Sequence, residues 1–96
     1  MTDSELVEMI VTNKLKEARG NVTRHAVKDT LLNILFGKDN EKAHDAEVNR
    51  LTQQWIQYID VVDPITWIIK CLCNQIAKSE KHLDLIRKSA KCTNMT

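Results

Sequence analysis

The fold predicted for this chain rests on residues 63–91, which read DPITWIIKCLCNQIAKSEKHLDLIRKSAK. Asp63 and Pro64 form a strong helix start, because Asp is a preferred N-cap and proline is tolerated at the first helical position. Apolar or small residues then recur in alternating steps of four and three, at Ile65, Ile69, Leu72, Ile76, Ser79, Leu83, Ile86 and Ala90. This 3.5-residue repeat predicts one long helix, about 64–91, packed lengthwise against another helix.

The two halves of this predicted helix differ in character. The first half is apolar nearly all round, because Trp67, Ile68, Cys71 and Cys73 lie off the repeat. The second half is basic on its outside. Residues 1–63 hold eight Lys or Arg against eleven Asp or Glu, whereas residues 64–96 hold six against two. We therefore expect the first half to be enclosed and the second half to face water or anions.

Three further helices are predicted upstream, at about 4–19, 24–36 and 41–60. Gly20 and Gly37 end the first two, because glycine readily adopts the conformation that closes a helix. Residues that can cap the three starts are Thr2, Asp3 or Ser4, then Thr23, then Asp39 or Asn40. The link between the third helix and the last is short, so these two helices are expected to fold back as an antiparallel pair.

The predicted fold class is all-α: a three- or four-helix bundle built on a long antiparallel helical hairpin, about 41–60 and 64–91. The chain of 96 residues is expected to form a single helical domain, 1–96, with residues 92–96 frayed. Two glycines and one proline favour helix over sheet. A chain of this length builds one modest core, so association with a partner or with itself would add to its stability.

Cysteine usage and hydropathy indicate a cytoplasmic (intracellular, reducing) protein. Three cysteines make an odd count, and Cys71 and Cys73 would point to different faces of one helix. No N-terminal apolar run with a basic flank marks a signal peptide, and no apolar run has the length of a membrane-spanning helix. We therefore expect no membrane partner.

Enzymatic chemistry is not expected. Cys71-x-Cys73 is too closely spaced for a zinc knuckle, and the three histidines are scattered along the chain. Both glycines lie at predicted helix ends, so no phosphate-cradling loop is indicated. The sequence predicts no catalytic residues, no metal, no cofactor and no small-molecule substrate.

The first candidate site is an apolar surface for a protein partner or for self-association. Its residues are Trp67, Ile68, Cys71 and Leu72, together with Lys70. Trp and Tyr are preferred anchors of protein interfaces, because they combine a large apolar area with a polar tip. Trp55 and Tyr58 lie nearby and are expected to fill the end of the core. For Trp67 a core position and a partner surface are both open.

The second candidate site is the basic outer face of the last helix, formed by Lys78, Lys81, Arg87, Lys88 and Lys91. Side chains spaced in this way could meet successive phosphates of a nucleic-acid duplex or an acidic protein surface. A solvated face with local ion pairs, such as Asp84 with Lys88, is the simpler interpretation.

A short segment resembles the opening of the Fis-type helix-turn-helix. It is Glu17-Ala18-Arg19-Gly20-Asn21-Val22-Thr23-Arg24-His25-Ala26. The resemblance implies DNA reading through a following glycine turn and a basic recognition helix. Residues 28–36 depart from that pattern and continue as an apolar helix without the turn. We interpret the shared part as a helix-capping signal.

These patterns predict a small non-enzymatic intracellular binding protein. It would act as an adaptor, inhibitor or modulator of a macromolecular partner through an apolar helical surface, as a homodimer or higher homo-oligomer. Small helical proteins of this class include modulators encoded by viruses and phages. The alternative function is a duplex RNA- or DNA-binding protein that uses the basic outer face of the last helix.

Overall fold

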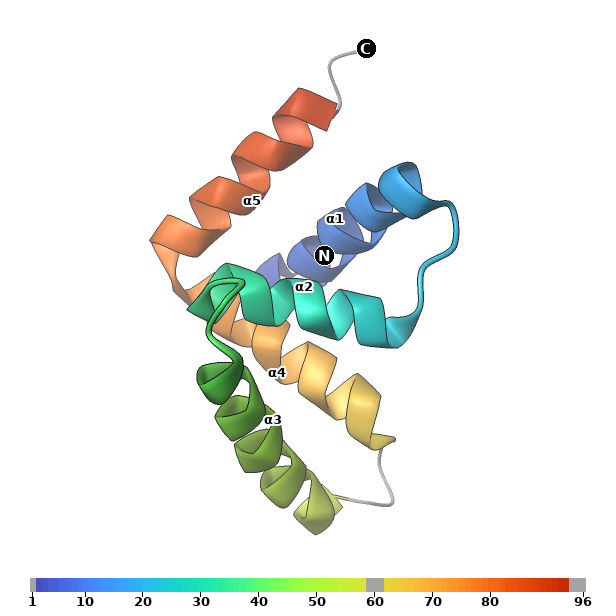
Figure 1. The fold of residues 1–96 in the computed structure, drawn as a ribbon. Coiled ribbons are helices and arrows are strands. Elements are labelled where there is room, and N and C mark those ends of the chain that lie inside the picture. The colour runs from blue at the N-terminus through green and yellow to red at the C-terminus, as the bar shows by residue number, and fades with distance from the viewer. Residues whose placement is uncertain (1, 59–61, 94–96) are drawn as a thin grey trace.

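The computed structural model describes residues 2–58 and 62–93, and every regular element in these ranges is a helix (Figure 1). The elements are α1 (Asp3–Arg19), α2 (Arg24–Phe36), α3 (Glu41–Trp55), the 3-10 turn η1 (Ile56–Tyr58), α4 (Pro64–Lys78) and α5 (Glu80–Thr93). The all-α prediction is therefore confirmed.

Capping residues set the helix starts as the sequence predicts. Thr2 and Glu5 form a capping box: the Thr2 hydroxyl accepts from the Glu5 N–H at 3.1 Å, and the Glu5 carboxylate accepts from the Thr2 N–H at 3.2 Å. These bonds to Thr2 lower the pKa of Glu5. Thr23, Asn40 and Asp63 cap α2, α3 and α4 in the same way, each accepting from a backbone N–H three residues on.

Glycine ends the first two helices. Gly20 and Gly37 have φ values of 80° and 89°, and their N–H groups donate to Lys16 O and Asn33 O. Glycine suits these positions because a side chain at positive φ is strained. His44 secures the turn after Gly37, since its Nε2 lies 2.7 Å from the Gly37 carbonyl oxygen.

The single long helix predicted for 64–91 is wrong, because the chain leaves the helical conformation at Ser79. Ser79 has φ −101° and ψ 109°, and its N–H donates to Ile76 O to close α4. The Ser79 carbonyl accepts from Leu83 N–H at 2.9 Å, and its hydroxyl lies 2.8 Å from His82 Nδ1. One serine thus ends α4 and begins α5, which is the capping role that serine fills well.

The predicted long hairpin is not the basis of the fold. α4 is the central helix: it packs against α1, α2 and α3, and its contacts with α1 and α2 are more extensive than those with α3. α3 ends at Trp55 and a 3-10 turn follows, so the helix predicted for 41–60 is also too long; residues 59 and 60 of that prediction lie outside the described part. α5 leaves the end of α4 at an angle and packs on α1 (Figure 1).

The core gathers around α4. The most completely buried side chains come from four helices, and each is less than 2% exposed: Val7, Leu31, Leu32, Leu51, Ile69, Leu72, Cys73 and Ile76. Full burial of one such aliphatic side chain contributes about 1.5–3 kcal/mol. α5 adds Leu83 and Ile86, which are 6% and 5% exposed. Five of the eight positions of the apolar repeat are therefore core positions: Ile69, Leu72, Ile76, Leu83 and Ile86. Ile65 and Ser79 are half-buried, and the side chain of Ala90 lies outside the described part.

Polar contacts fix the start of α4 against α2 and the end of α3. Thr66 Oγ1 donates to Asp63 and accepts from the Arg24 guanidinium at 2.9 Å. The half-buried Trp55 donates from its indole N–H to the Val62 carbonyl oxygen at 2.6 Å. Trp55 thus connects the end of α3 to the segment before α4, and the expectation that it fills the end of the core stays a prediction. The side chain of Tyr58 lies outside the described part.

Candidate interaction surface

The outer face of α4 is the side opposite its core residues. Five residues spaced by three or four along the helix form it, and each is exposed or half-buried: Trp67, Lys70, Cys71, Asn74 and Lys78. This spacing places residues on one side of a helix. Trp67 and Cys71 are half-buried, whereas Lys70, Asn74 and Lys78 are exposed. The outer face therefore combines an apolar patch with two cations.

Two residues of the predicted apolar surface do not belong to it. Ile68 is 5% exposed and Leu72 is 0% exposed, and both are part of the core. In the folded monomer neither side chain is available to a partner. The structure thus separates the predicted set into a core pair, Ile68 and Leu72, and a surface group of Trp67, Lys70 and Cys71.

A polar network joins α3 to one edge of the outer face. Glu47 on α3 is only 9% exposed, and its carboxylate accepts from Arg50 at 2.8 and 2.6 Å and from the Gln75 amide of α4. The bonds from Arg50 lower the pKa of Glu47 despite its burial. The network holds a charged group at the α3–α4 contact, and it places Arg50 beside Cys71.

The two thiols on α4 are not activated. Burial raises the pKa of the half-buried Cys71, and burial raises the pKa of the fully buried Cys73 to about 12. Both therefore remain neutral thiols at physiological pH, whereas a reactive cysteine needs a lowered pKa. Both thiols contribute packing instead: Cys73 lies in the core, and the half-buried Cys71 packs against the core cluster from the outer face.

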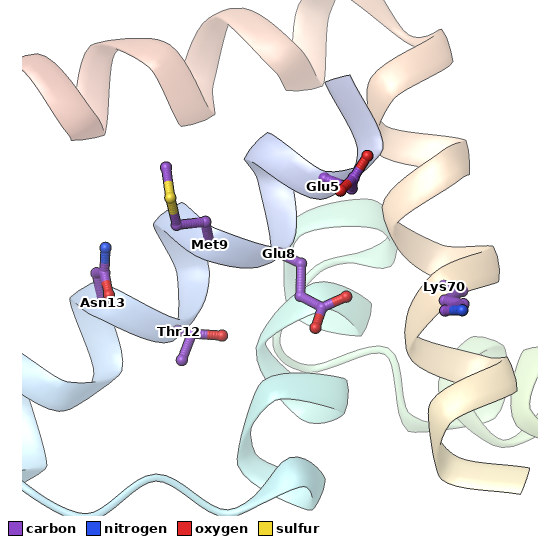
Figure 2. Close-up of a pocket in the computed structure, with 6 residues that line it drawn as sticks. All are labelled: Glu5, Glu8, Met9, Thr12, Asn13 and Lys70. Atoms are coloured by element: carbon purple, nitrogen blue, oxygen red, sulfur yellow. The ribbon is translucent and has the colours of Figure 1, made fainter. Parts of the chain in front are cut away.

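A polar hollow lies on the other edge of the outer face, between α1 and α4. It measures about 510 Å³ and is lined by Glu5, Glu8, Met9, Thr12 and Asn13 of α1 and by Lys70 of α4. Figure 2 shows Glu8 projecting from α1 into the space between the two helices, with Lys70 on the α4 side. Lys70 therefore stands between the hollow and the apolar patch of Trp67.

Sequence reasoning missed this hollow and the buried Glu47. The hollow joins residues more than fifty positions apart, so no local pattern could predict it. Its α1 members do share a signal, because Glu5, Glu8 and Thr12 recur at helical spacing on the polar side of α1. Glu47 gave no signal at all, since a glutamate in a helix is ordinarily solvent-exposed.

The basic face predicted for the last helix is divided by the break at Ser79. Lys78 belongs to α4, whereas Lys81 and Lys88 are exposed on α5. Arg87 faces α1, where its guanidinium lies 4.0 Å from the Asp3 carboxylate. The side chain of Lys91 lies outside the described part. The described α5 surface also carries exposed Glu80, Asp84 and Leu85, so its cations are not contiguous.

Within residues 2–58 and 62–93, no helix is both long and apolar enough to cross a bilayer. The same ranges contain no cluster of three or more His, Cys, Asp or Glu suited to hold a metal ion. Comparison of the chain with protein-family models, with the sequences of curated proteins and with solved structures found no match.

Proposed function

We propose that this chain is a small non-enzymatic binding protein whose outer face of α4 docks a protein partner. The observation that supports the proposal most is Trp67, a large amphipathic side chain that stays half-buried on the side of α4 opposite the core. Tryptophan is among the residues that most often dominate interface energetics. The helix that carries Trp67 is firmly placed, because Ile68 and Ile69, the next two residues on α4, are 5% and 1% exposed.

Charge complementarity specifies the kind of partner. Lys70 lies beside the Trp67–Cys71 patch, Lys78 lies about two turns beyond Cys71 along α4, and both are exposed. The last third of the chain, from residue 64 onward, carries six Lys or Arg against two Asp or Glu. An apolar pocket with an acidic rim would match this surface, because flanking cations accelerate encounter and fix orientation while the buried aromatic supplies affinity. We infer a partner surface of that type.

Binding to a nucleic-acid duplex is the alternative. It is supported by the exposed lysines at positions 78, 81 and 88. It is weakened by exposed Glu80 and Asp84 among those lysines and by the engagement of Arg87 with Asp3. Because each additional phosphate contact steepens the salt dependence of affinity, duplex binding would weaken strongly as salt rises.

An affinity capture with matched variants tests the proposal. The tagged chain is compared with Trp67→Asp and with a Lys70→Glu/Lys78→Glu double variant, with and without nuclease. Lys42→Glu, on the exposed side of α3, is the control for a change of charge away from the face. Circular dichroism and thermal melting establish that each variant is folded.

The proposal predicts a nuclease-resistant protein partner that the Lys42→Glu variant retains. The Lys70→Glu/Lys78→Glu variant should capture at least tenfold less of this partner than the wild-type chain does. Trp67→Asp should no longer capture the partner, although the variant stays helical and melts cooperatively. Capture of one partner equally by all four chains would contradict the role of the outer face. Recovery that collapses with nuclease and with a Lys81→Ala/Lys88→Ala variant would establish the duplex alternative instead.

A further inference from the structure

We propose that two copies of this chain associate by exchanging α5, so that the α5 of each copy packs on the α1 of the other. The inference goes beyond the proposed function, because docking of a partner on the outer face of α4 does not require the exchange of α5. It starts from the junction between α4 and α5, where Ser79 is the only residue outside the helical conformation. A change of one ψ angle at Ser79, from 109° to about −42°, would join the two helices.

The sequence on both sides of Ser79 is compatible with the joined form. The apolar repeat from Ile65 to Ala90 continues through Ser79 without a change of phase. No glycine or proline lies between Ile65 and Thr96, so nothing else in the segment opposes a continuous helix. The bonds made by Ser79 as a cap would be replaced by ordinary backbone bonds of the helix, so hydrogen bonding is nearly balanced between the two forms.

Geometry determines where α5 would go. A continuous helix from Pro64 to Thr93 would be about 45 Å long, and its second half would point away from the α1 of its own chain. Leu83 and Ile86 are 6% and 5% exposed in the bent form, and both side chains would become exposed to solvent in the continuous helix. The α1 surface beneath them, including Ile10 and Val11, would lose its cover as well.

The occupant that fits this exposed α1 surface is the α5 of a second copy, because each copy would present both halves of a contact that already exists within the monomer. The ion pair between Arg87 and Asp3 would form again across the two chains. Exchange of an identical element through a short hinge is a general route to dimers. Here the hinge is one residue, which is too short to let a straightened α5 fold back.

The existing α1–α5 contact is also incompletely packed. A mostly apolar hollow of about 200 Å³ lies between Ile86 of α5, Ile10, Val11 and Leu15 of α1, and Ile34 of α2. The hollow is partly open to solvent, so the contact covers the apolar side of α5 incompletely. The monomeric contact is therefore weaker than the contacts around α4, which lowers the barrier to release of α5.

Two substitutions at Ser79 shift the equilibrium in opposite directions. Ser79→Ala removes the cap hydroxyl and favours the continuous helix, whereas Ser79→Asp keeps a capping oxygen and favours the bend. Thr52→Ala is the matched control, because it removes a hydroxyl that bonds within α3, away from the hinge. The measurement is oligomeric state against concentration, by light scattering coupled to size exclusion.

The proposal predicts that Ser79→Ala lowers the dimer dissociation constant roughly thirtyfold, the factor expected when each of the two chains in the dimer loses one N-cap. Ser79→Asp should raise it, and Thr52→Ala should leave it unchanged. In a mixture of two differently isotope-labelled samples of the Ser79→Ala dimer, NMR contacts between Ile10 and Ile86 should connect different molecules. The same distribution of species in all four proteins would overturn the proposal, as would a dimer whose Ile10–Ile86 contacts stay within one chain.

If Ser79→Ala does not fold, the wild-type chain at millimolar concentration replaces it in the labelled mixture, and the same contacts decide the question. Failure of the exchange is distinguishable from failure of the proposed function. Ser79 lies outside the outer face of α4, so a monomeric chain that still loses its partner on Lys70→Glu/Lys78→Glu would reject only the exchange.

Discussion

α4 and α5 share one apolar repeat in the sequence, yet they occupy very different surroundings. Three helices pack on α4, and Ile69, Leu72, Cys73 and Ile76 are at most 1% exposed. α5 packs on α1 and on the end of α4, and its apolar contact includes an unfilled hollow. A shared apolar repeat therefore indicates which side chains are buried. The number of helices around each position determines how much that side chain contributes to the stability of the fold.

Truncation of a core side chain on α4 should lower the stability of the fold more than any other change considered. Leu72→Ala should lower the free energy of unfolding by about 2–5 kcal/mol, because it leaves a cavity where Leu72 is 0% exposed and four helices meet. Chemical denaturation monitored by circular dichroism measures it. The whole chain should become less stable in one transition, and a change below 1 kcal/mol would show that α4 is not the centre of the core.

Leu83→Ala should have a smaller and more local effect. Leu83 is 6% exposed, but α5 is covered on one side only, so we expect a loss of about 2 kcal/mol confined mainly to α5. Leu85→Ala is the matched control, because Leu85 is 53% exposed on the same helix and should change stability by less than about 0.5 kcal/mol. Equal effects at the two positions would contradict the assignment of the buried side of α5.

Acid should weaken the α3–α4 contact, with the smallest expected effect. The pKa of Glu47 is lowered from its ordinary value of 4.5, so the folded state prefers the carboxylate. The resulting stability is present above the ordinary carboxyl range and is lost as pH falls through the lower folded-state pKa.

The ionised Glu47 should contribute about 1 kcal/mol to the free energy of unfolding, because its Arg50 partner is half-exposed and water screens the ion pair. Denaturation midpoints between pH 6 and pH 3 measure it. Glu47→Gln should reduce the pH dependence, since the amide does not titrate. If the stability of Glu47→Gln depends on pH as steeply as that of the wild-type chain, other carboxylates cause the loss of stability in acid.

Local signals in the sequence predicted helix ends well. Thr23, Gly20, Gly37 and the Asp63-Pro64 pair act as expected, because capping depends on a few adjacent residues and on hydrogen bonds within one turn. The break at Ser79 was missed although serine is itself a capping residue. Its place in the apolar repeat concealed that role, and the docking of α5 on α1, which also favours the bend, leaves no local signal in the sequence.

The candidate surface was predicted less completely, for a related reason. Trp67, Ile68, Cys71 and Leu72 are all apolar neighbours in sequence, and periodicity alone could not tell which of them face the core. That assignment depends on which helices surround α4, and the antiparallel hairpin predicted a different arrangement from the one in which α1 and α2 cover it. Lys70 was included as a member of the apolar stretch, and the structure places it at the edge of the hollow.

Residue-resolved native-state hydrogen exchange tests most directly whether the chain is divided at Ser79 into an enclosed α4 and a separable α5. Amides of α4, such as those of Leu72 and Ile76, should exchange only through global unfolding. Amides of α5, such as those of Leu83 and Ile86, should exchange through a partial opening with a lower free energy and a smaller dependence on denaturant. Exchange of both helices with the same free energy and the same denaturant dependence would contradict this division, because α5 would then be as firmly held as the core.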